Sequence, residues 1–213
     1  MLNSFLNSNF IKKNHLLLFF FIFTVSRLVI FNILEVKINT PVYGYHLLNE
    51  DLLKNDLFQS LIFLHSQPPL FNLYQGIFLK IFENYAEITV AFNTIQAFFS
   101  LGIIYISYLL SNFFNLSLKQ KIFLVFILIF NPSIIFYENL FSYHLFTAFL
   151  FLLMAYFILK KFIENNDKYE IYVYLIISIL CLTWGVFQPI LIIFFYSCFR
   201  FADRFFSKKI FFL

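Results

Sequence analysis

The sequence has few charged residues. Asp, Glu, Lys and Arg together make up 12% of the chain, whereas hydrophobic residues make up 62% and the mean hydropathy is +0.84. Soluble globular domains carry about 25% charged residues, so this composition excludes a soluble domain with a water-facing surface. Phenylalanine alone supplies 36 of the 213 residues. The composition therefore predicts an integral membrane protein.

The sequence also lacks the motifs of several soluble functions. Its two cysteines, Cys181 and Cys198, lie in apolar sequence, and neither has the CxxC or Cys/His spacing of a metal or redox site. The formal charge of +4 is spread over short polar intervals rather than collected in a basic patch. We therefore expect no nucleic-acid partner and assign no metal ligands.

A signal-peptide cleavage site is missing as well. Lys12 and Lys13 precede an apolar run from His15 to Leu34, which imitates a signal peptide. This run has no small-residue cleavage site and is about as long as the ~20 residues that a membrane span requires. We therefore expect an uncleaved membrane anchor.

Apolar stretches predict an all-α fold, a polytopic bundle of transmembrane helices in a single domain over 1–213. A helical span needs about 20 apolar residues, and stretches of this or nearly this length are separated here by short polar intervals. They occur at 16–34, 88–114, 122–137, 145–159 and 171–199.

The stretch 69–82 decides the expected topology, because apolar segments of ~10–14 residues are more often interfacial than spanning. If it does not cross, the lysines before 16–34, after 88–114 and after 145–159 share one side, which the positive-inside rule makes cytoplasmic. The interval 35–87 is then an outer loop in which acids outnumber lysines. If 69–82 crosses instead, Lys119 and Lys121 lie outside. We favour the first arrangement, in a bacterial inner membrane with a cytoplasmic N-terminus.

The last apolar run, 171–199, is too long for one ordinary span. Gly185 and Pro189 both weaken a helix interior, so we expect a break or a hairpin near 184–189. The basic residues after the run then return to the cytoplasm. They are Arg200, Arg204, Lys208 and Lys209.

Within the outer loop, Asn49 is a candidate cap for a helix that begins at Glu50, and leucines at 48, 52, 53 and 57 form one apolar stripe. This pattern predicts an amphipathic helix on the membrane surface. Glu50 has the spacing for an ion pair with Lys54, and we favour that interpretation. For Asp51, stabilisation by the helix dipole and a catalytic role are about equally supported.

The segment His65-Ser66-Gln67-Pro68-Pro69 follows. Two successive prolines disfavour helix before them and preset the first turn of the helix after them. His65 and Gln67 would therefore be held at a defined place. A Pro-Pro turn is also an ordinary structural device, so the turn by itself favours neither a functional nor a structural role.

Polar residues near the apolar runs are further candidates. Arg27 lies inside the first run, roughly 10 Å from its outer end at ~1.5 Å per residue. An intramembrane arginine is a functional candidate with a lipid-carrier phosphate as its natural partner, although snorkelling toward the outer headgroups explains it nearly as well. Glu138, Tyr143 and His144 flank the second outer turn and are lower-ranked candidates for lining the same cavity.

These features together resemble a known family. A first transmembrane helix, an outer loop with acids on an amphipathic helix, and then H-x-Q-P-P-L-F-N-L over 65–73 resemble the polytopic GT-C glycosyltransferases. That class includes the protein O-mannosyltransferases and the lipid A aminoarabinose transferases. The stretch from Asn131 to Asn139 also resembles the helix end with Pro and Tyr that approaches the outer cavity in that class.

The resemblance implies transfer of a sugar from a polyprenyl-phosphate carrier to an acceptor on the outer face, with inversion and no covalent intermediate. Asp51 best matches the family's first-loop acid and Glu50 is second, whereas Asn49 stands where related sequences often carry the acid. His65 and Gln67 would orient acceptor or phosphate. Some relatives use a divalent metal, and no ligand set here demonstrates one. Family members are about twice this length, so the chain would be the N-terminal part of a longer module.

Two other interpretations stay open. A transporter or channel component would use the broken last helix and Arg27 as parts of a permeation path. Against it, the polar residues cluster near one membrane face rather than at mid-membrane. A non-catalytic fragment of the glycosyltransferase module is the other alternative.

Overall fold

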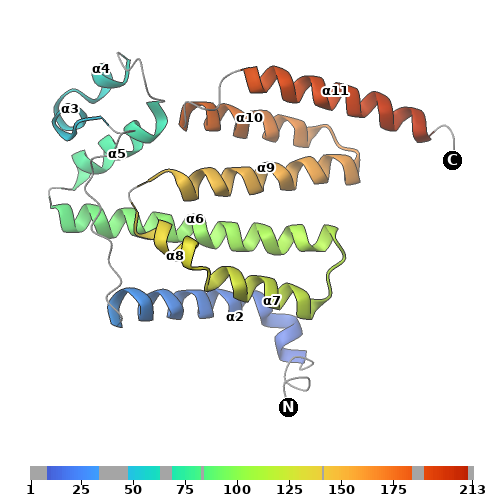
Figure 1. Cartoon of the computed structure of the whole chain (residues 1–213), viewed down its shortest axis with the longest axis horizontal. Coiled ribbons are helices and arrows are strands. Elements are labelled where there is room, and N and C mark those ends of the chain that lie inside the picture. The colour runs from blue at the N-terminus through green and yellow to red at the C-terminus, as the bar shows by residue number, and fades with distance from the viewer. Residues whose placement is uncertain are drawn as a thin grey trace.

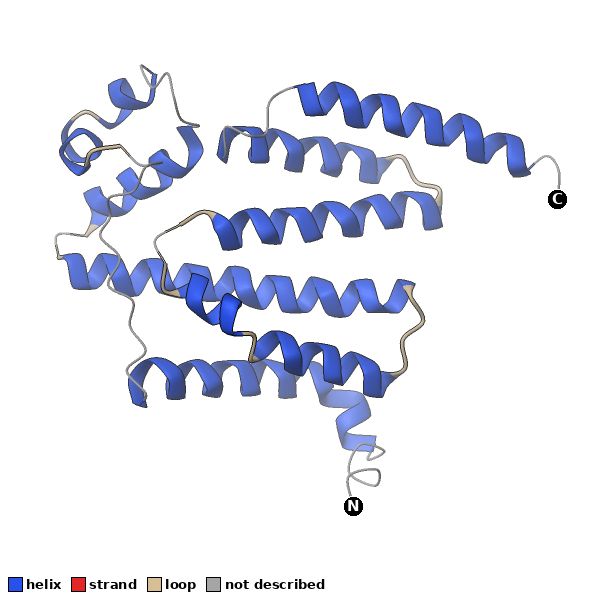
Figure 2. Cartoon of the chain, in the orientation of Figure 1, coloured by secondary structure: helices blue, strands red, loops and turns tan. Residues whose placement is uncertain are grey.

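The computed structural model describes residues 9–33, 48–62, 69–82, 84–140, 142–183 and 190–210. Throughout these ranges the regular structure is helical, without any strand, so the predicted all-α class is confirmed (Figure 2). The helices in the first part of the chain are α2 (Asn9–Leu28) with the π-helical turn η1 (Val29–Ile33), α3 (Glu50–Asn55), α4 (Leu57–Ile62) and α5 (Pro69–Ile81). The remaining helices are α6 (Tyr85–Phe113), α7 (Leu118–Ile129), α8 (Pro132–Glu138), α9 (His144–Glu164), α10 (Lys168–Thr183) and α11 (Ile190–Ile210).

Two of the described helices are long and apolar enough to cross a membrane. They are Ala86–Phe113 in α6 and His144–Glu164 in α9, and the bent pair of α7 and α8 makes a third if it counts as one span. The apolar parts of α2 and α11, Leu16–Phe31 and Ile190–Arg200, are shorter. The helices therefore fit the expected membrane protein with two or three candidate spans, fewer than the apolar runs of the sequence suggest.

The predicted span 122–137 is not one continuous helix. It divides into α7 and α8, which are bent by 46°. The cause is local: Asn131 Oδ1 accepts the backbone N–H groups of Ser133 at 2.9 Å and Ile134 at 3.4 Å, and Pro132 occupies the first turn of the new helix. A side-chain cap followed by proline begins a helix and leaves the last carbonyls of the preceding one without their usual donors.

The expected break in 171–199 is confirmed, because α10 ends at Thr183 and α11 begins at Ile190. The residues between them lie outside the described ranges. In Figure 1, α11 runs back along α10, and Arg200 of α11 lies 4.0 Å from Glu170 in the first turn of α10. The aliphatic and aromatic residues between α9, α10 and α11 form one core cluster that includes Leu150, Val173 and Phe199.

Four segments that carry most of the basic residues lie toward one end of the helix layer, whereas Lys54 of α3 and Lys80 of α5 lie at the other end. The α6–α7 connection, the α9–α10 connection and the end of α11 are on the right of Figure 1, and the start of α2 lies at the bottom, nearer the middle. The short helices α3 and α4 and the oblique helix α5 lie at the opposite end. This separation of the basic segments from α3–α5 is the arrangement expected if 69–82 does not run across the layer.

Candidate functional site

The first helix of the candidate site begins where the sequence predicts. Asn49 is the N-cap of α3, and its Oδ1 accepts the backbone N–H of Asp51 at 2.9 Å. Such a cap satisfies a donor that would otherwise lack a partner and typically contributes about 1 kcal/mol to helix stability. The backbone at Asp51 is therefore anchored in the first turn of α3.

The two acids of this turn have different surroundings. Glu50 is 5% exposed and forms an ion pair with Lys54 at 2.7 Å, which confirms the favoured interpretation of that residue. Asp51 is exposed, and its carboxylate makes no hydrogen bond or ion pair with a residue that the structure describes. Of the two acids, Asp51 is therefore the one whose carboxylate faces solvent.

The helix α3 is attached to α5, the helix that follows the Pro-Pro segment. The backbone N–H of Leu48 donates to Asn72 Oδ1 at 2.8 Å, and Asn72 is buried. Leu53 and Leu57 pack in the same cluster as Phe78 of α5. The turn that carries Asp51 is thus held against the first turns of α5.

The predicted leucine stripe is only partly correct. Leu53 and Leu57 are buried, but Leu52 is 46% exposed, and the expected single helix is divided at Asp56 into α3 and α4. The short α3 buries one face on α5, and position 52 lies on the opposite side. The start of α5 at Pro69 agrees with the proline signal. His65 and Gln67 lie outside the described residues.

Arg27 forms a buried ion pair with Glu138. Nε donates to Oε2 and Nη2 to Oε1, both at 2.7 Å, so the pair is bidentate. Arg27 is 6% exposed and Glu138 is 0% exposed. The snorkelling interpretation of Arg27 is therefore wrong, since its guanidinium reaches into the protein. It likewise faces a carboxylate rather than an open cavity for a carrier phosphate.

Two further contacts connect this pair to α6 and α7. Arg27 Nη1 donates to the backbone C=O of Ile129 at 2.5 Å and to Ser26 Oγ at 3.2 Å. Ser100 of α6 donates its hydroxyl to Glu138 Oε1. The carbonyl of Ile129 is one of those left by the α7–α8 break, so Arg27 supplies the donor that the interrupted helix cannot. We call Arg27, Glu138, Ser100, Ser26 and the Ile129 carbonyl the Arg27 network.

Further buried polar groups occur on α5, on α6 and in the turn before α9. Gln96 donates Nε2 to the backbone C=O of Ser142 at 2.8 Å, while Gln96 Oε1 and Ser142 Oγ have no partner among the described residues. The hydroxyl of Tyr74 and both amide atoms of Gln75 are also buried without such a partner. Each buried polar group left without a hydrogen bond costs roughly 1–3 kcal/mol. Water, a polar ligand or a residue outside the described ranges would remove this cost.

Aromatic rings adjoin these polar groups. The Tyr74 ring lies 5.7 Å from that of Phe92, and the Phe71 ring lies 5.5 Å from that of Tyr143, between ring centroids. Phe92, Gln96 and Ser100 are spaced by four residues along α6, so they share its buried face. The rings of Phe71, Phe92 and Tyr143 are themselves buried, so this region belongs to the packed interior.

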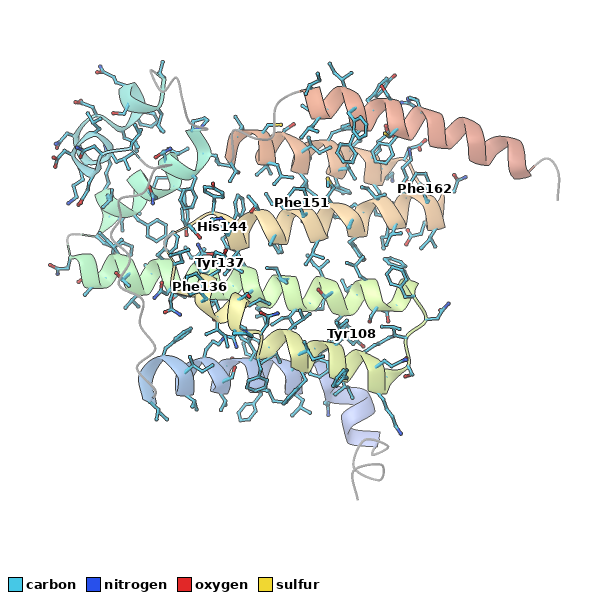
Figure 3. All side chains as sticks on the ribbon, viewed as in Figure 1. Tyr108, Phe136, Tyr137, His144, Phe151 and Phe162 are labelled. Carbon is cyan, nitrogen blue, oxygen red and sulfur yellow. The ribbon has the colours of Figure 1, made fainter. Side chains whose placement is uncertain are left out.

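Tyr143 and His144 lie where α9 begins. The His144 ring stacks on Tyr143 and on Tyr137, with centroids 4.9 Å apart in both pairs. Figure 3 shows the labelled residues Tyr137 and His144 together at the start of α9. Tyr143 is buried, and burial raises the pKa of its phenol, so it stays a protonated donor at neutral pH. His144 is exposed at the same end of the molecule as α3–α5.

Sequence reasoning missed Asn72, Gln75, Gln96 and Ser100. A usable signal exists for the last two, because polar residues at four-residue spacing inside an apolar helix mark a buried polar face. Asn72 lies inside the segment H-x-Q-P-P-L-F-N-L, but no sequence signal marked it as a candidate site residue. In the described ranges, no group of three or more His, Cys, Asp or Glu residues is arranged to hold a metal ion.

A third buried ionic cluster lies at the opposite end of the molecule, where α9, α10 and α11 meet. Lys161 contacts Glu170 at 2.9 Å, and Tyr174 donates its hydroxyl to Glu170 at 2.9 Å. Arg200 of α11 lies 4.0 Å from Glu170. These contacts join the three helices and lie far from the predicted site residues along the helix axes (Figure 1).

Comparisons with known proteins give no relative on which a function could be based. No family model, no curated protein and no solved structure matches this chain.

Proposed function

We propose that this protein is a membrane glycosyltransferase that moves a sugar from a polyprenyl-phosphate carrier to an acceptor at the outer membrane face. The observation that carries the proposal is the position of Asp51. It is an exposed carboxylate on a capped helical turn, and a hydrogen bond from Leu48 to Asn72 attaches that turn to the helix of the H-x-Q-P-P-L-F-N-L segment.

The proposed reaction is a single displacement. Asp51 takes the proton of the acceptor hydroxyl while the acceptor oxygen forms a bond to the anomeric carbon of the sugar. The bond from that carbon to the carrier phosphate breaks, and the phosphate leaves with the electron pair. Hydrogen-bond donors from His65, Gln67 and His144 stabilise the charge on the departing phosphate.

The buried polar groups around α5 support a sugar as the transferred group. Tyr74, Gln75 and Gln96 carry hydroxyl and amide atoms that lack partners among the described residues, and the ring of Tyr74 lies beside that of Phe92. In this proposal, Arg27 and Glu138 act as a structural cross-link that positions α8 and the turn before α9, and they do not contact the carrier phosphate.

The proposed topology is multi-pass, with the N-terminus in the cytoplasm of a bacterium and α3–α5 on the outer leaflet of the inner membrane. The common location of the basic segments at one end of the helix layer supports it, because cytoplasmic loops are enriched in Lys and Arg.

Asp51→Asn tests the proposal. In membranes supplied with polyprenyl-phosphate-linked ¹⁴C-hexose or ¹⁴C-pentose, transfer of label to acceptor should fall by about 10²–10⁴-fold, because the proton acceptor is lost. Asp56→Asn is the matched control, since Asp56 is an exposed acid at the other end of α3 and its loss should leave the rate unchanged. Protein abundance is measured by immunoblot in each case. Undiminished transfer by Asp51→Asn would remove Asp51 from the mechanism.

A transporter component is the second candidate, and the buried Arg27–Glu138 pair is the observation that favours it. Ionisable pairs inside membrane helices often mark ion or substrate pathways. Vesicles that contain the protein should be assayed in parallel for glycosyl transfer and for flux of labelled sugars. Flux in the absence of transfer would support the transporter and contradict the glycosyltransferase.

A further inference from the structure

An apolar pocket opens between α2, α6 and α7. It has a volume of about 170 Å³ and is lined by the side chains of Leu16, Phe20, Leu101, Ile104, Tyr108 and Val125, among others. The three helices are apolar along the pocket. Two of the lining side chains, Leu16 and Phe20, are exposed. A pocket lined by aliphatic and aromatic side chains in a membrane protein suits part of an acyl chain rather than a water-soluble ligand.

The lining residues of the pocket are spread along the axis of α6. Leu101 and Tyr108 are seven residues apart on α6, which is about 10 Å at ~1.5 Å per residue. Tyr108 lies toward the end of α6 that adjoins the α6–α7 connection, and Figure 3 shows it between α6 and α7 near that end. Leu101 lies deeper in the helix layer. A chain that enters beside Tyr108 therefore extends toward Leu101.

A cation lies beside one of the lining residues. The ammonium group of Lys121 is 5.9 Å from the centroid of the Tyr108 ring, which itself lines the pocket. Lys121 donates to Asn112 Oδ1 at 2.5 Å, and because this amide is neutral, the contact leaves the positive charge of the lysine uncancelled. An ammonium group has three donors, so it can bind a phosphate oxygen in addition to Asn112.

We propose that this pocket is a binding site for one anionic phospholipid of the surrounding leaflet. Lys121 contacts the headgroup phosphate region, and one acyl chain lies along Tyr108 and Ile104 toward Leu101. Charge complementarity selects the occupant: a net negative headgroup is attracted by Lys121, whereas a zwitterionic headgroup gains much less. This inference does not depend on glycosyl transfer, since it concerns the end of the molecule opposite α3–α5.

Native mass spectrometry of the full chain in detergent tests the site. The purified, delipidated protein is titrated with dioleoyl-phosphatidylglycerol or with dioleoyl-phosphatidylcholine, and the occupancy of the first bound lipid is measured. Phosphatidylglycerol should bind about fivefold more tightly, the factor expected from one lysine at an anionic headgroup. Equal binding of the two lipids would overturn the proposal.

Two variants test the contributions of the lysine and of the apolar pocket separately. Lys121→Gln should remove the preference for phosphatidylglycerol and leave phosphatidylcholine binding unchanged, whereas Leu101→Phe should fill the pocket and weaken both. Lys168→Gln, which changes an exposed lysine at the same end but on α10, is the control and should change neither. Loss of the preference in Lys168→Gln but not in Lys121→Gln would contradict the assignment.

Other occupants give different results in the same experiment. Displacement of phosphatidylglycerol by an equimolar polyprenyl phosphate would make the pocket a carrier site and overturn the proposal. Dimers that disappear in Leu101→Phe would assign the pocket to a second copy of the chain, which would overturn it as well. Far-UV circular dichroism and thermal unfolding of each variant show whether Leu101→Phe is folded. If it is not, the Lys121→Gln result alone decides.

Discussion

Glu138 shows how one buried carboxylate can organise several segments. It binds the guanidinium of Arg27 and the hydroxyl of Ser100, and Arg27 in turn binds the carbonyl of Ile129. A buried ion pair contributes little net stability compared with apolar residues of the same size, because desolvation offsets the attraction. Breaking such a pair is costly, since it leaves one buried charge without its partner.

We therefore expect Glu138→Gln to lower the free energy of unfolding by about 3–5 kcal/mol, because it leaves the Arg27 charge buried beside a neutral amide. The double variant with Arg27→Met and Glu138→Leu removes both charges and should be less destabilised than the single variant. Thermal unfolding in detergent micelles, followed by circular dichroism, measures the difference. A double variant that is less stable than Glu138→Gln would contradict a purely structural pair.

The helices themselves are positioned by close contacts that composition does not reveal. Gly102 of α6 faces Phe149 of α9, and a Cβ atom at position 102 would lie 2.6 Å from Phe149 Cε2. Side chains essentially never approach this closely, so the ring would have to move. The α6–α9 contact therefore depends on the absence of a side chain at position 102.

The sign of the stability change in Gly102→Ala tests the contact between α6 and α9. Helix propensity alone would stabilise α6 by about 1 kcal/mol, whereas the collision with Phe149 should cost about 1–3 kcal/mol. We expect a net loss of stability in detergent unfolding, and Phe149→Leu combined with Gly102→Ala should recover part of it. A gain of stability in Gly102→Ala alone would show that α6 and α9 are not packed in this way.

Other elements could be predicted from the sequence to different degrees. Asn49, Pro69 and the pair Asn131-Pro132 are local signals, and each lies where a helix begins. The sequence pattern did not predict that α7 and α8 are separate helices, because an uninterrupted apolar run outweighed the cap inside it. Nor did it predict the division of α3 from α4, since the leucine spacing continues across Asp56.

The distribution of basic residues over the whole molecule predicts its orientation in a membrane. The basic segments lie at one end of the helix layer, and α3–α5 lie at the other (Figure 1). In the proposed orientation, which follows the positive-inside rule, the first end faces the cytoplasm. The proposed site at Asp51 can act on an outer-face acceptor only with this orientation.

Cysteine labelling of intact cells checks the orientation. In a background with Cys181→Ser and Cys198→Ser, a single cysteine replaces either Asn84, the exposed cap of α6, or Asp167, in the α9–α10 connection. A membrane-impermeant maleimide should label Asn84→Cys directly and Asp167→Cys only after the cells are permeabilised. The reverse pattern would put α3–α5 in the cytoplasm and remove the outer-face reaction.

Local interactions between neighbours in the chain determined the helical class, the apolar character and most helix starts, which is why the sequence by itself predicts them. The tertiary structure decided which groups meet. Arg27 and Glu138 are 111 residues apart, and only the packing of α2 against the broken α7–α8 segment pairs them. The packing of α2 against α6 and α7 forms the pocket beside Tyr108, and separate contacts between α3 and α5 hold the Asp51 turn in place. Which distant polar groups pair with each other depends on their proximity in the folded chain, and the local spacing of residues does not reveal that proximity.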